Sequence, residues 1–282
     1  MPGIAQAGSS LVGAFSTRLL IAAYTGPVIS LRLSSGGAAQ PFFTDSFQSY
    51  FSTGPGNTGL SLASWAGSAT PLVDTWYDQS GNGNNAATLD TTTASNIFLT
   101  SNTNGVFTLQ FQQPASSGLQ FTTPVQPTAI YTQMYNTNAY YGSLITAPVD
   151  YTVRFGRSGT DINGDSNGED WFYTGAGSKV AFNNGSPSTT ITLNAWNAMV
   201  LSVESPVWQT SSSGGTTTAF SRIGYDSTGF GRGFSGSLSE MVLLSGFSAT
   251  ASSASDYWST SLMVKARPPG GWPFEFEFER WD

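Results

Sequence analysis

The sequence predicts an all-β protein, a sandwich or a barrel of antiparallel strands. Short apolar stretches recur along the chain, and each is bounded by Gly, Pro, Asn or Ser, which favour turns. These stretches lack helical periodicity. The 282 residues include 32 Gly and are 13% aromatic, so the chain has both the turns and the apolar surface that one large β domain needs.

The first part of the chain predicts an arm, a strand and a helix. Residues 1–13 are small and polar, and we expect them to form a loose N-terminal arm. Residues 24–27 read Tyr-Thr-Gly-Pro, a turn, and residues 28–33 alternate in polarity as a strand does. Residues 60–67 predict one short helix with Leu62 and Trp65 facing inward.

Residues 73–78 predict a strand that leads into a stiff loop. Their β-branched and aromatic side chains fit a pleated sheet. The loop over residues 79–85 reads Gln-Ser-Gly-Asn-Gly-Asn-Asn, in which Gly and Asn supply the positive φ angles of a tight turn. We therefore expect a buried strand followed by an amide-rich loop.

Two later strands and a helix can also be predicted. Residues 107–111 show the clearest alternation of apolar and polar side chains. Residues 241–244 are continuously apolar, as in a strand that is buried on both sides. Residues 248–264 carry apolar side chains at helical spacing after a polar start.

Three of these segments resemble one known family. The run Trp-Tyr-Asp-Gln-Ser-Gly-Asn-Gly over residues 76–83 is similar to the signature of laminin-G-like, concanavalin A-type domains. Residues 14–33 and 223–246 are similar to the opening and closing segments of the same domains. The family includes the catalytic domain of arabinofuranosidase B and virion proteins of phages and giant viruses. The resemblance implies a single concanavalin A-like jelly-roll β-sandwich over residues 14–266, with one or two short helices and a C-terminal extension.

The composition excludes several kinds of partner and chemistry. The net charge is −7 and no cluster of Lys and Arg is visible, so we expect neither nucleic-acid binding nor binding to an anionic membrane surface. The longest apolar run, residues 19–24, is too short to span a bilayer, so we expect no membrane insertion. The chain has no Cys and no His, which excludes disulfides, thiol nucleophiles and imidazole bases. The first residues do not read as a signal peptide.

Asp226 is the candidate catalytic residue. Residues 224–227 are similar to the segment that holds the general-acid Asp of the arabinofuranosidase family, and Asp226 matches that Asp. The family's nucleophile is a Glu near an adjacent Cys-Cys pair, and this chain has no Cys. Because a retaining glycosidase needs two carboxylates, we expect no enzyme. The alternative for Asp226 is a side chain that caps a turn.

An acidic loop is the candidate metal site. Residues 161–170 place oxygen ligands at alternate positions, a pattern that suits calcium. The alternative is a solvated hairpin tip whose Asn-Gly and Asp residues set the turn. The candidate ligands are Asp161, Asn163, Asp165 and Asp170.

The signature segment is the candidate carbohydrate site. Its amides and carboxylate could bind sugar hydroxyls while an aromatic ring stacks on a sugar face. The alternative is that the aromatic side chains are core and the amides hold the backbone of the loop. The candidates are Trp76, Tyr77, Asp78, Gln79, Asn82 and Asn84.

Residues 267–282 predict a docking tail. After a Pro-Pro-Gly-Gly break, strict alternation places three Phe on one face of a strand, which would be an aggregation hazard if exposed. The tail either covers the sheet of its own domain or adds to a neighbouring subunit. The residues expected at that contact are Trp272, Phe274, Phe276, Phe278 and Trp281.

These observations favour a non-enzymatic structural or adhesion protein of a virus particle. We expect an oligomer whose tail contacts other capsid subunits and whose jelly roll binds a cell-surface glycan. No cofactor is implied other than calcium. The alternative is a secreted glycoside hydrolase or carbohydrate-binding module of the arabinofuranosidase B type.

Overall fold

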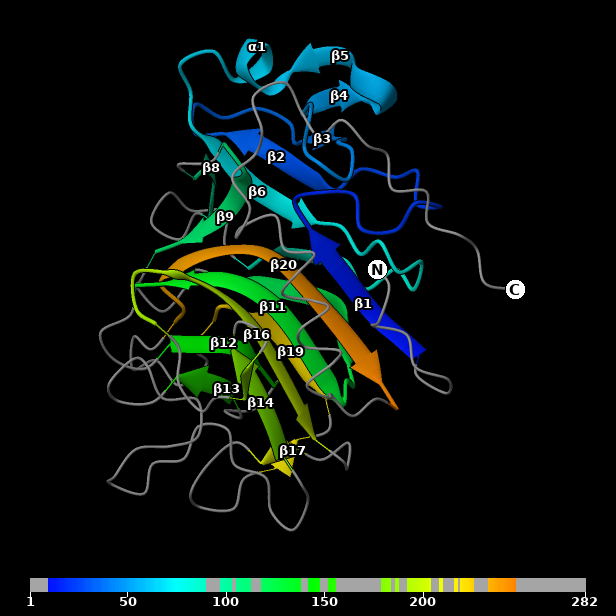
Figure 1. The fold of residues 1–282 in the computed structure, drawn as a ribbon. Coiled ribbons are helices and arrows are strands. Elements are labelled where there is room, and N and C mark those ends of the chain that lie inside the picture. Colours follow the sequence, from blue (N-terminus) through cyan, green and yellow to red (C-terminus); the bar gives the residue numbers. More distant parts are fainter. Residues whose placement is uncertain are drawn as a thin grey trace.

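A computed structural model gives the fold (Figure 1). The structure describes residues 10–89, 97–102, 105–112, 118–137, 142–147, 152–155, 179–183, 186–187, 192–203, 208–209, 216–217, 219–225 and 233–246. No helix among these residues is both long and apolar enough to cross a membrane.

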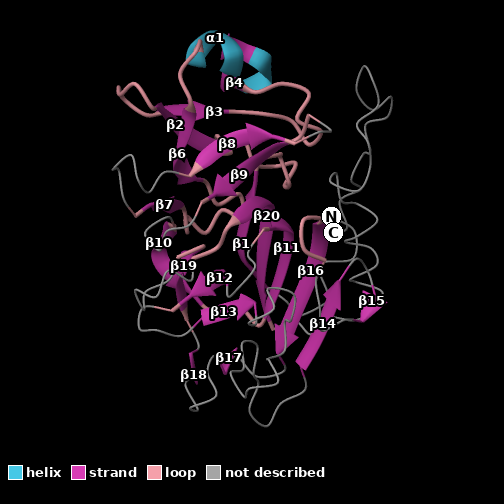
Figure 2. Cartoon of the chain, turned by 90° about the vertical axis from the view of Figure 1, so that its left-hand side faces the viewer, coloured by secondary structure: helices cyan, strands magenta, loops and turns pink. Residues whose placement is uncertain are grey.

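The described residues are almost entirely β-structure (Figure 2). The strands are β1 Ser10–Ser16, β2 Ile29–Leu33, β3 Gln40–Phe42, β4 Ser52–Gly54, β5 Thr58–Ser61, β6 Pro71–Trp76, β7 Ala86–Thr88, β8 Phe98–Ser101, β9 Phe107–Phe111, β10 Leu119–Val125, β11 Ala129–Asn136, β12 Gly142–Thr146, β13 Thr152–Phe155, β14 Lys179–Asn183, β15 Ser186–Pro187, β16 Trp196–Val203, β17 Trp208–Gln209, β18 Thr216–Thr217, β19 Phe220–Ile223 and β20 Gly236–Ser245. The helices described are α1, Leu62–Ala66, and a single 3₁₀ turn, η1, Pro55–Asn57.

One large antiparallel sheet curls through the molecule. Its strands follow the order β13-β12-β19-β10-β7-β6-β8-β9-β20-β11-β16-β14-β15, while β1 pairs with β20, and β2 pairs with β6 and β3. Some neighbours in this order are consecutive strands, such as β8 and β9, and others are far apart in sequence, as in β20 beside both β9 and β11. This architecture confirms the all-β, sandwich-type fold class predicted from the sequence.

The apolar side chains form two clusters on opposite faces of the central strands. The larger contains the fully buried Trp76 together with Phe15 and Phe121. The ring centroid of Phe15 lies 5.7 Å from that of Trp76 and 5.5 Å from that of Phe121. The smaller contains Val242 and Leu244. Because Met241 and Leu243 of β20 belong to the larger cluster, β20 is buried on both faces, as the apolar run predicted.

The small helix and the N-terminal strand refine two predictions. Helix α1 lies inside the predicted range, and Leu62 and Trp65 pack against the main core, as expected. Strand β1 begins at Ser10 and pairs with β20, so residues 10–13 of the predicted arm belong to the sheet. The predicted helix over residues 248–264 lies outside the described residues.

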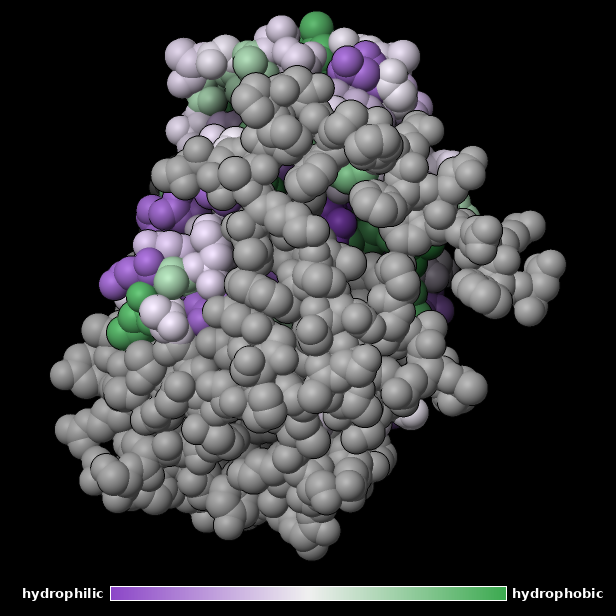
Figure 3. Space-filling view, viewed as in Figure 1, coloured by the Kyte–Doolittle hydropathy of each residue, from purple (hydrophilic) through white to green (hydrophobic). Residues whose placement is uncertain are grey.

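The described surface around α1, β4 and β5 mixes hydrophilic and hydrophobic residues (Figure 3). Leu60 of β5 is the large apolar side chain that is exposed among the described residues, at 53%. A single exposed Leu is ordinary for a folded surface, so it does not define a contact site.

Candidate functional site

The signature segment after β6 forms a clamp on the N-terminal strand. The carboxylate of Asp78 is buried and accepts four hydrogen bonds. Its Oδ1 accepts from the backbone N–H of Ala14 and of Ser80, both at 2.9 Å. Its Oδ2 accepts from Ser80 Oγ at 2.8 Å and from the backbone N–H of Asn84 at 3.0 Å. One side chain thus fixes both its own loop and β1.

Gln79 extends the clamp along the segment that follows β1. Its Oε1 accepts from the backbone N–H of Leu20 at 2.7 Å, and its Nε2 donates to the carbonyl of Arg18 at 2.8 Å. Its own backbone N–H donates to the carbonyl of Ala14 at 2.7 Å. The side chain is 1% exposed, so these contacts occupy it inside the protein.

The asparagines of the loop complete the clamp. Asn82 Nδ2 donates to the carbonyl of Leu11 at 2.6 Å, and Asn84 Nδ2 donates to that of Val12 at 2.9 Å. Asn85 Oδ1 accepts from the backbone N–H of Asp78 at 3.0 Å. These amides bind backbone groups of the chain itself, as local side-chain hydrogen bonds do in tight loops.

The structure therefore brings all six carbohydrate candidates together. The polar ones surround the N-terminal strand and the residues after it, and they do not line an open sugar site. Trp76 is fully buried in the main core, and Tyr77 and Asn82 are at least partly exposed. The polar candidates Asp78, Gln79 and Asn84 already bind protein groups. Carbohydrate binding by these residues stays a prediction.

Tyr24 lies beside the clamp. Its hydroxyl donates to the carbonyl of Pro27 at 2.8 Å. Burial, together with the nearby Tyr77 and Asp78, raises the pKa of Tyr24 to about 12, and burial is the largest of these causes. Tyr24 therefore stays neutral at physiological pH and acts as a hydrogen-bond donor.

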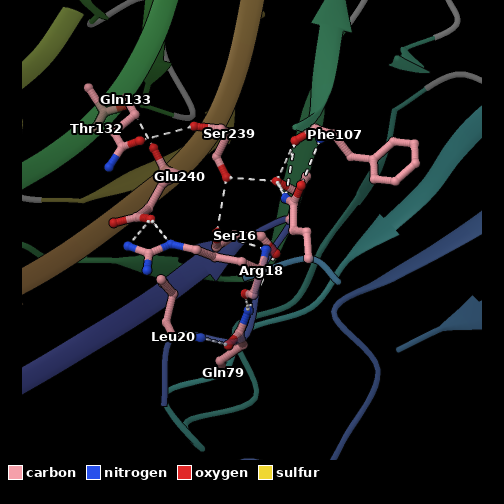
Figure 4. Close-up of polar contacts among 11 residues, drawn as sticks. Ser16, Arg18, Leu20, Gln79, Phe107, Thr132, Gln133, Ser239 and Glu240 are labelled. Atoms are coloured by element: carbon pink, nitrogen blue, oxygen red, sulfur yellow. Dashed lines mark hydrogen bonds and ion pairs between the residues drawn. The ribbon is translucent and has the colours of Figure 1, made fainter. Parts of the chain in front are cut away.

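A buried ion pair links β20 to the end of β1 (Figure 4). Arg18 Nε donates to Glu240 Oε2 at 3.0 Å, and Arg18 Nη2 lies 2.9 Å from the same oxygen without hydrogen-bond geometry. The two side chains are 13% and 2% exposed. Glu240 Oε1 and Gln133 Nε2, which belong to paired residues on β20 and β11, have no hydrogen-bond partner among the described residues.

Hydroxyl and amide groups surround this pair. Thr132 Oγ1 donates to the carbonyl of Glu240 at 2.9 Å, and Ser16 Oγ donates to the carbonyl of Ser239 at 3.1 Å. Gln48 contacts the neighbouring Thr17: its Nε2 donates to Thr17 Oγ1 at 2.7 Å. The backbone of residues 239–240 is thus held by side chains of neighbouring segments, whereas the buried Glu240 carboxylate is held by Arg18.

Each described carboxylate has an internal hydrogen bond. Asp45 accepts from two backbone N–H groups, Asp74 accepts from Thr75 Oγ1, and Asp78 and Glu240 are held as described above. Asp78 and Glu240 are buried, whereas Asp45 and Asp74 are partly exposed. The candidate Asp226 lies in the part of the chain outside the described residues.

Several predicted site residues lie in that remaining part of the chain. They are Asp226, the acidic-loop residues Asp161, Asn163, Asp165 and Asp170, and the tail residues Trp272, Phe274, Phe276, Phe278 and Trp281. Within the described ranges, no group of three or more acidic side chains gathers as a metal site would require. Calcium binding and tail docking stay predictions.

Sequence reasoning missed Arg18 and Arg222. Arg18 pairs with an acid 222 positions away, and no local pattern reports such a pairing. Arg222 is a cationic residue in an otherwise apolar or small strand, β19, of a chain with only ten Lys and Arg. A cation among apolar and small residues was the signal in the sequence that could have marked Arg222.

The fold is an antiparallel β-sandwich, and the clamp ties its signature segment to the N-terminal strand. No protein-family model matches the sequence, and no curated protein matches it significantly. The chain is similar in structure to an arabinofuranosidase complexed with arabinofuranosyl-α-1,2-xylobiose, with a TM-score of 0.51 and 16% identity. It is similar to GH54 α-L-arabinofuranosidases soaked with 4-nitrophenyl α-L-arabinofuranoside or with a cyclic sulfate inhibitor, with TM-scores of 0.50.

These matches cover 89% of this chain and 62% of each matched chain. At 16% identity they show a shared fold. They also correct the sequence-based expectation that the protein is not an enzyme, because the similar structures are glycoside hydrolases. None of the comparisons links the chain to a virus particle.

Proposed function

We propose that this protein is a carbohydrate-active enzyme that hydrolyses α-L-arabinofuranosyl linkages. The observation that carries the proposal is the match of 89% of the chain to arabinofuranosidase structures. The signature segment supports it, since the part of the sequence that resembles this family forms the clamp that holds residues 14–20 in place.

Asp226 is the proposed general acid. It follows Tyr225 directly, and the preceding Gly224 is fixed by a hydrogen bond from its N–H to the carbonyl of Leu144 at 2.9 Å. In this role the Asp226 carboxyl group protonates the oxygen of the leaving group. The second carboxylate would come from the acids outside the described residues, of which Asp165 and Asp170 are candidates.

The test is hydrolysis of two arabinofuranosides that differ in their leaving group. 4-Nitrophenolate leaves without much acid assistance, whereas a xylo-oligosaccharide needs it. Asp226→Asn should therefore lower kcat by about 10²-fold to 10⁴-fold on an arabinosylated xylo-oligosaccharide and less on the nitrophenyl substrate. Asp74→Asn, which changes an acid on β6, is the matched control and should keep full activity.

Two results would overturn the proposal. One is full activity of Asp226→Asn on both substrates. The other is a folded wild-type protein that binds arabinoxylan without turning it over, which would make the chain a carbohydrate-binding module. Calcium binding, tail-mediated assembly and location in a virion or outside the cell are separate predictions, tested by calcium titration and by deleting residues 268–282.

A further inference from the structure

The strands β1, β20, β11 and β16 share a buried face opposite the main core (Figure 1). Val242 pairs with Ala14 on one side and with Tyr131 on the other. Tyr131 pairs in turn with Val200, so one row of side chains crosses all four strands. All four belong to the smaller apolar cluster and are at most 3% exposed. This face is therefore covered along its whole width.

The described residues supply only part of that cover. Among them, the apolar side chains that pack on the face from outside these four strands are Leu20 and Ile21. Both follow β1, the outermost of the four strands. Tyr131 and Val200 lie two and three strands further, about 10 and 14 Å away at about 4.8 Å per strand. Because the structure is that of a single chain, the rest of the cover has to come from residues outside the described ranges.

The backbone of a covering segment decides what conformation suits it. The backbone N–H and C=O groups of these strands bond within the sheet, so they are not free to bond to a segment that lies on the face. A helix satisfies its own backbone groups, whereas a single extended segment does not. This requirement disfavours the tail, residues 267–282, whose alternation predicts a strand.

Residues 248–264 have the position and the length that the cover needs. Strand β20 ends at Ser245, and Leu244 beside it belongs to the buried face. A segment that begins three residues later therefore starts next to the face. As a helix it would be about 25 Å long, whereas the four strands span about 14 Å between their axes.

The side chains of this segment match the face. Ala251, Trp258 and Leu262 recur at the spacing that places them on one side of a helix. Asp256, the only charged residue of the segment, falls on the opposite side. The segment therefore offers an uncharged, largely apolar side to an apolar sheet face.

The polar edge of the face fits the same segment. Glu240 and Gln133 form the next paired row, beside Val242 and Tyr131. Glu240 Oε1 and Gln133 Nε2 are buried without a hydrogen-bond partner among the described residues. A hydroxyl both donates and accepts, so one serine can partner an acceptor and a donor together. Residues 248–264 are rich in serine.

We propose that residues 248–264 form a helix that packs on this face and completes the domain. The inference does not depend on the proposed function. It makes the segment part of the fold, so that residues 267–282 leave the domain from a fixed point. It also closes this face of the sheet to a glycan.

Photo-crosslinking in the full chain tests the placement. A benzophenone amino acid that replaces Trp258 should link to residues 129–136, 196–203 or 236–245 of the same chain. The same amino acid in place of Thr260, on the opposite side of the helix, is the matched control and should link to none of these strands. Mass spectrometry of the digested protein identifies the linked peptides.

Hydrogen exchange tests the packing in a second way. Trp258→Asp places a charge against the face and should speed the exchange of the amides in residues 129–136 and 196–203 about tenfold to a hundredfold. Thr260→Asp adds the same charge on the opposite side and should leave their exchange unchanged. Equal exchange in the two variants would contradict the packing of Trp258 on the sheet.

Three crosslinking results would overturn the inference. One is a set of links from position 258 to other parts of the chain only. Another is a link to these strands from a benzophenone that replaces Phe276, because the tail would then be the cover. The third is a covalent dimer, which would show that the segment of a second copy covers the face.

Discussion

Two buried polar regions of this molecule differ in how completely they are hydrogen-bonded. In the clamp, Asp78 and Gln79 have found partners for their carboxylate and amide groups within residues 14–20 and within their own loop. Where β12 pairs with β19, Thr146 Oγ1 and Arg222 Nε have none. Both regions are shielded from solvent, so burial alone does not distinguish them.

The difference predicts opposite effects of mutation on stability. A satisfied network rigidifies the fold, and removing one member leaves its partners buried and unpaired. A buried hydroxyl without a partner costs desolvation free energy and returns no hydrogen bond. Clamp variants should therefore lose stability, whereas removing an unpartnered hydroxyl should not.

The largest expected effect is that of Asp78→Ala. It removes the acceptor of four hydrogen bonds and leaves buried N–H groups unpaired, so we expect a loss of about 4 kcal/mol or more in the free energy of unfolding. Urea unfolding measures this. Asp74→Ala on β6, the strand that precedes the clamp, removes one hydrogen bond and should cost about 1 kcal/mol or less. A similar cost for both variants would contradict the structural role of the clamp.

The second effect concerns the Glu240 pair, which is only partly satisfied. Glu240→Gln leaves the Arg18 guanidinium largely buried without its counter-charge, and we expect a loss of about 3 kcal/mol. Replacing both residues, Arg18→Met with Glu240→Leu, should restore much of that stability. A double-mutant cycle from urea unfolding measures the coupling, and strictly additive losses would show that the pair does not interact.

The third effect is a small change in the free energy of unfolding, which we expect to have opposite signs at two threonines. Thr146→Val removes an unpartnered hydroxyl and should leave stability unchanged or raise it by up to about 1 kcal/mol. Thr132→Val removes a hydroxyl that donates to the carbonyl of Glu240 and should cost about 1 kcal/mol. Both side chains are fully buried, so the comparison isolates the hydrogen bond. Thermal unfolding of the two variants is sufficient.

The smallest effect is confined to alkaline pH. Because the pKa of Tyr24 rises from 10.0 to about 12 on folding, its neutral form is favoured in the native state. Its contribution to stability is complete below pH 10 and is lost as the pH rises towards 12. Tyr24→Phe should therefore flatten the fall in unfolding free energy over this range. An unchanged slope would show that other groups cause it.

The sequence predicted those parts of the fold that depend on neighbouring residues. The apolar run in β20 and the helix α1 were recognisable because burial on both faces and helical spacing leave local patterns. The partners of the signature segment were not, since β1 lies more than 60 positions away and is bound through backbone atoms. Backbone acceptors carry no sequence signal.

The expectation of a non-enzyme failed for a related reason. It relied on the absence of the Cys-Cys pair that marks the nucleophilic Glu of the similar family. A catalytic pair is defined by distance in the folded chain, so an absent local motif cannot exclude it. Arg222 was overlooked because its cross-strand neighbour, Thr146, lies on another strand and cannot be identified from the local sequence.

The clamp also has a consequence for protein engineering. Because Asp78, Gln79 and the asparagines contact the main chain of residues 11–20, they recognise the path of that segment more than its composition. Positions within residues 11–20 whose side chains face solvent could carry labels or new side chains while the loop keeps its shape. A synthetic peptide with an altered sequence should dock into a protein that lacks its own first strand.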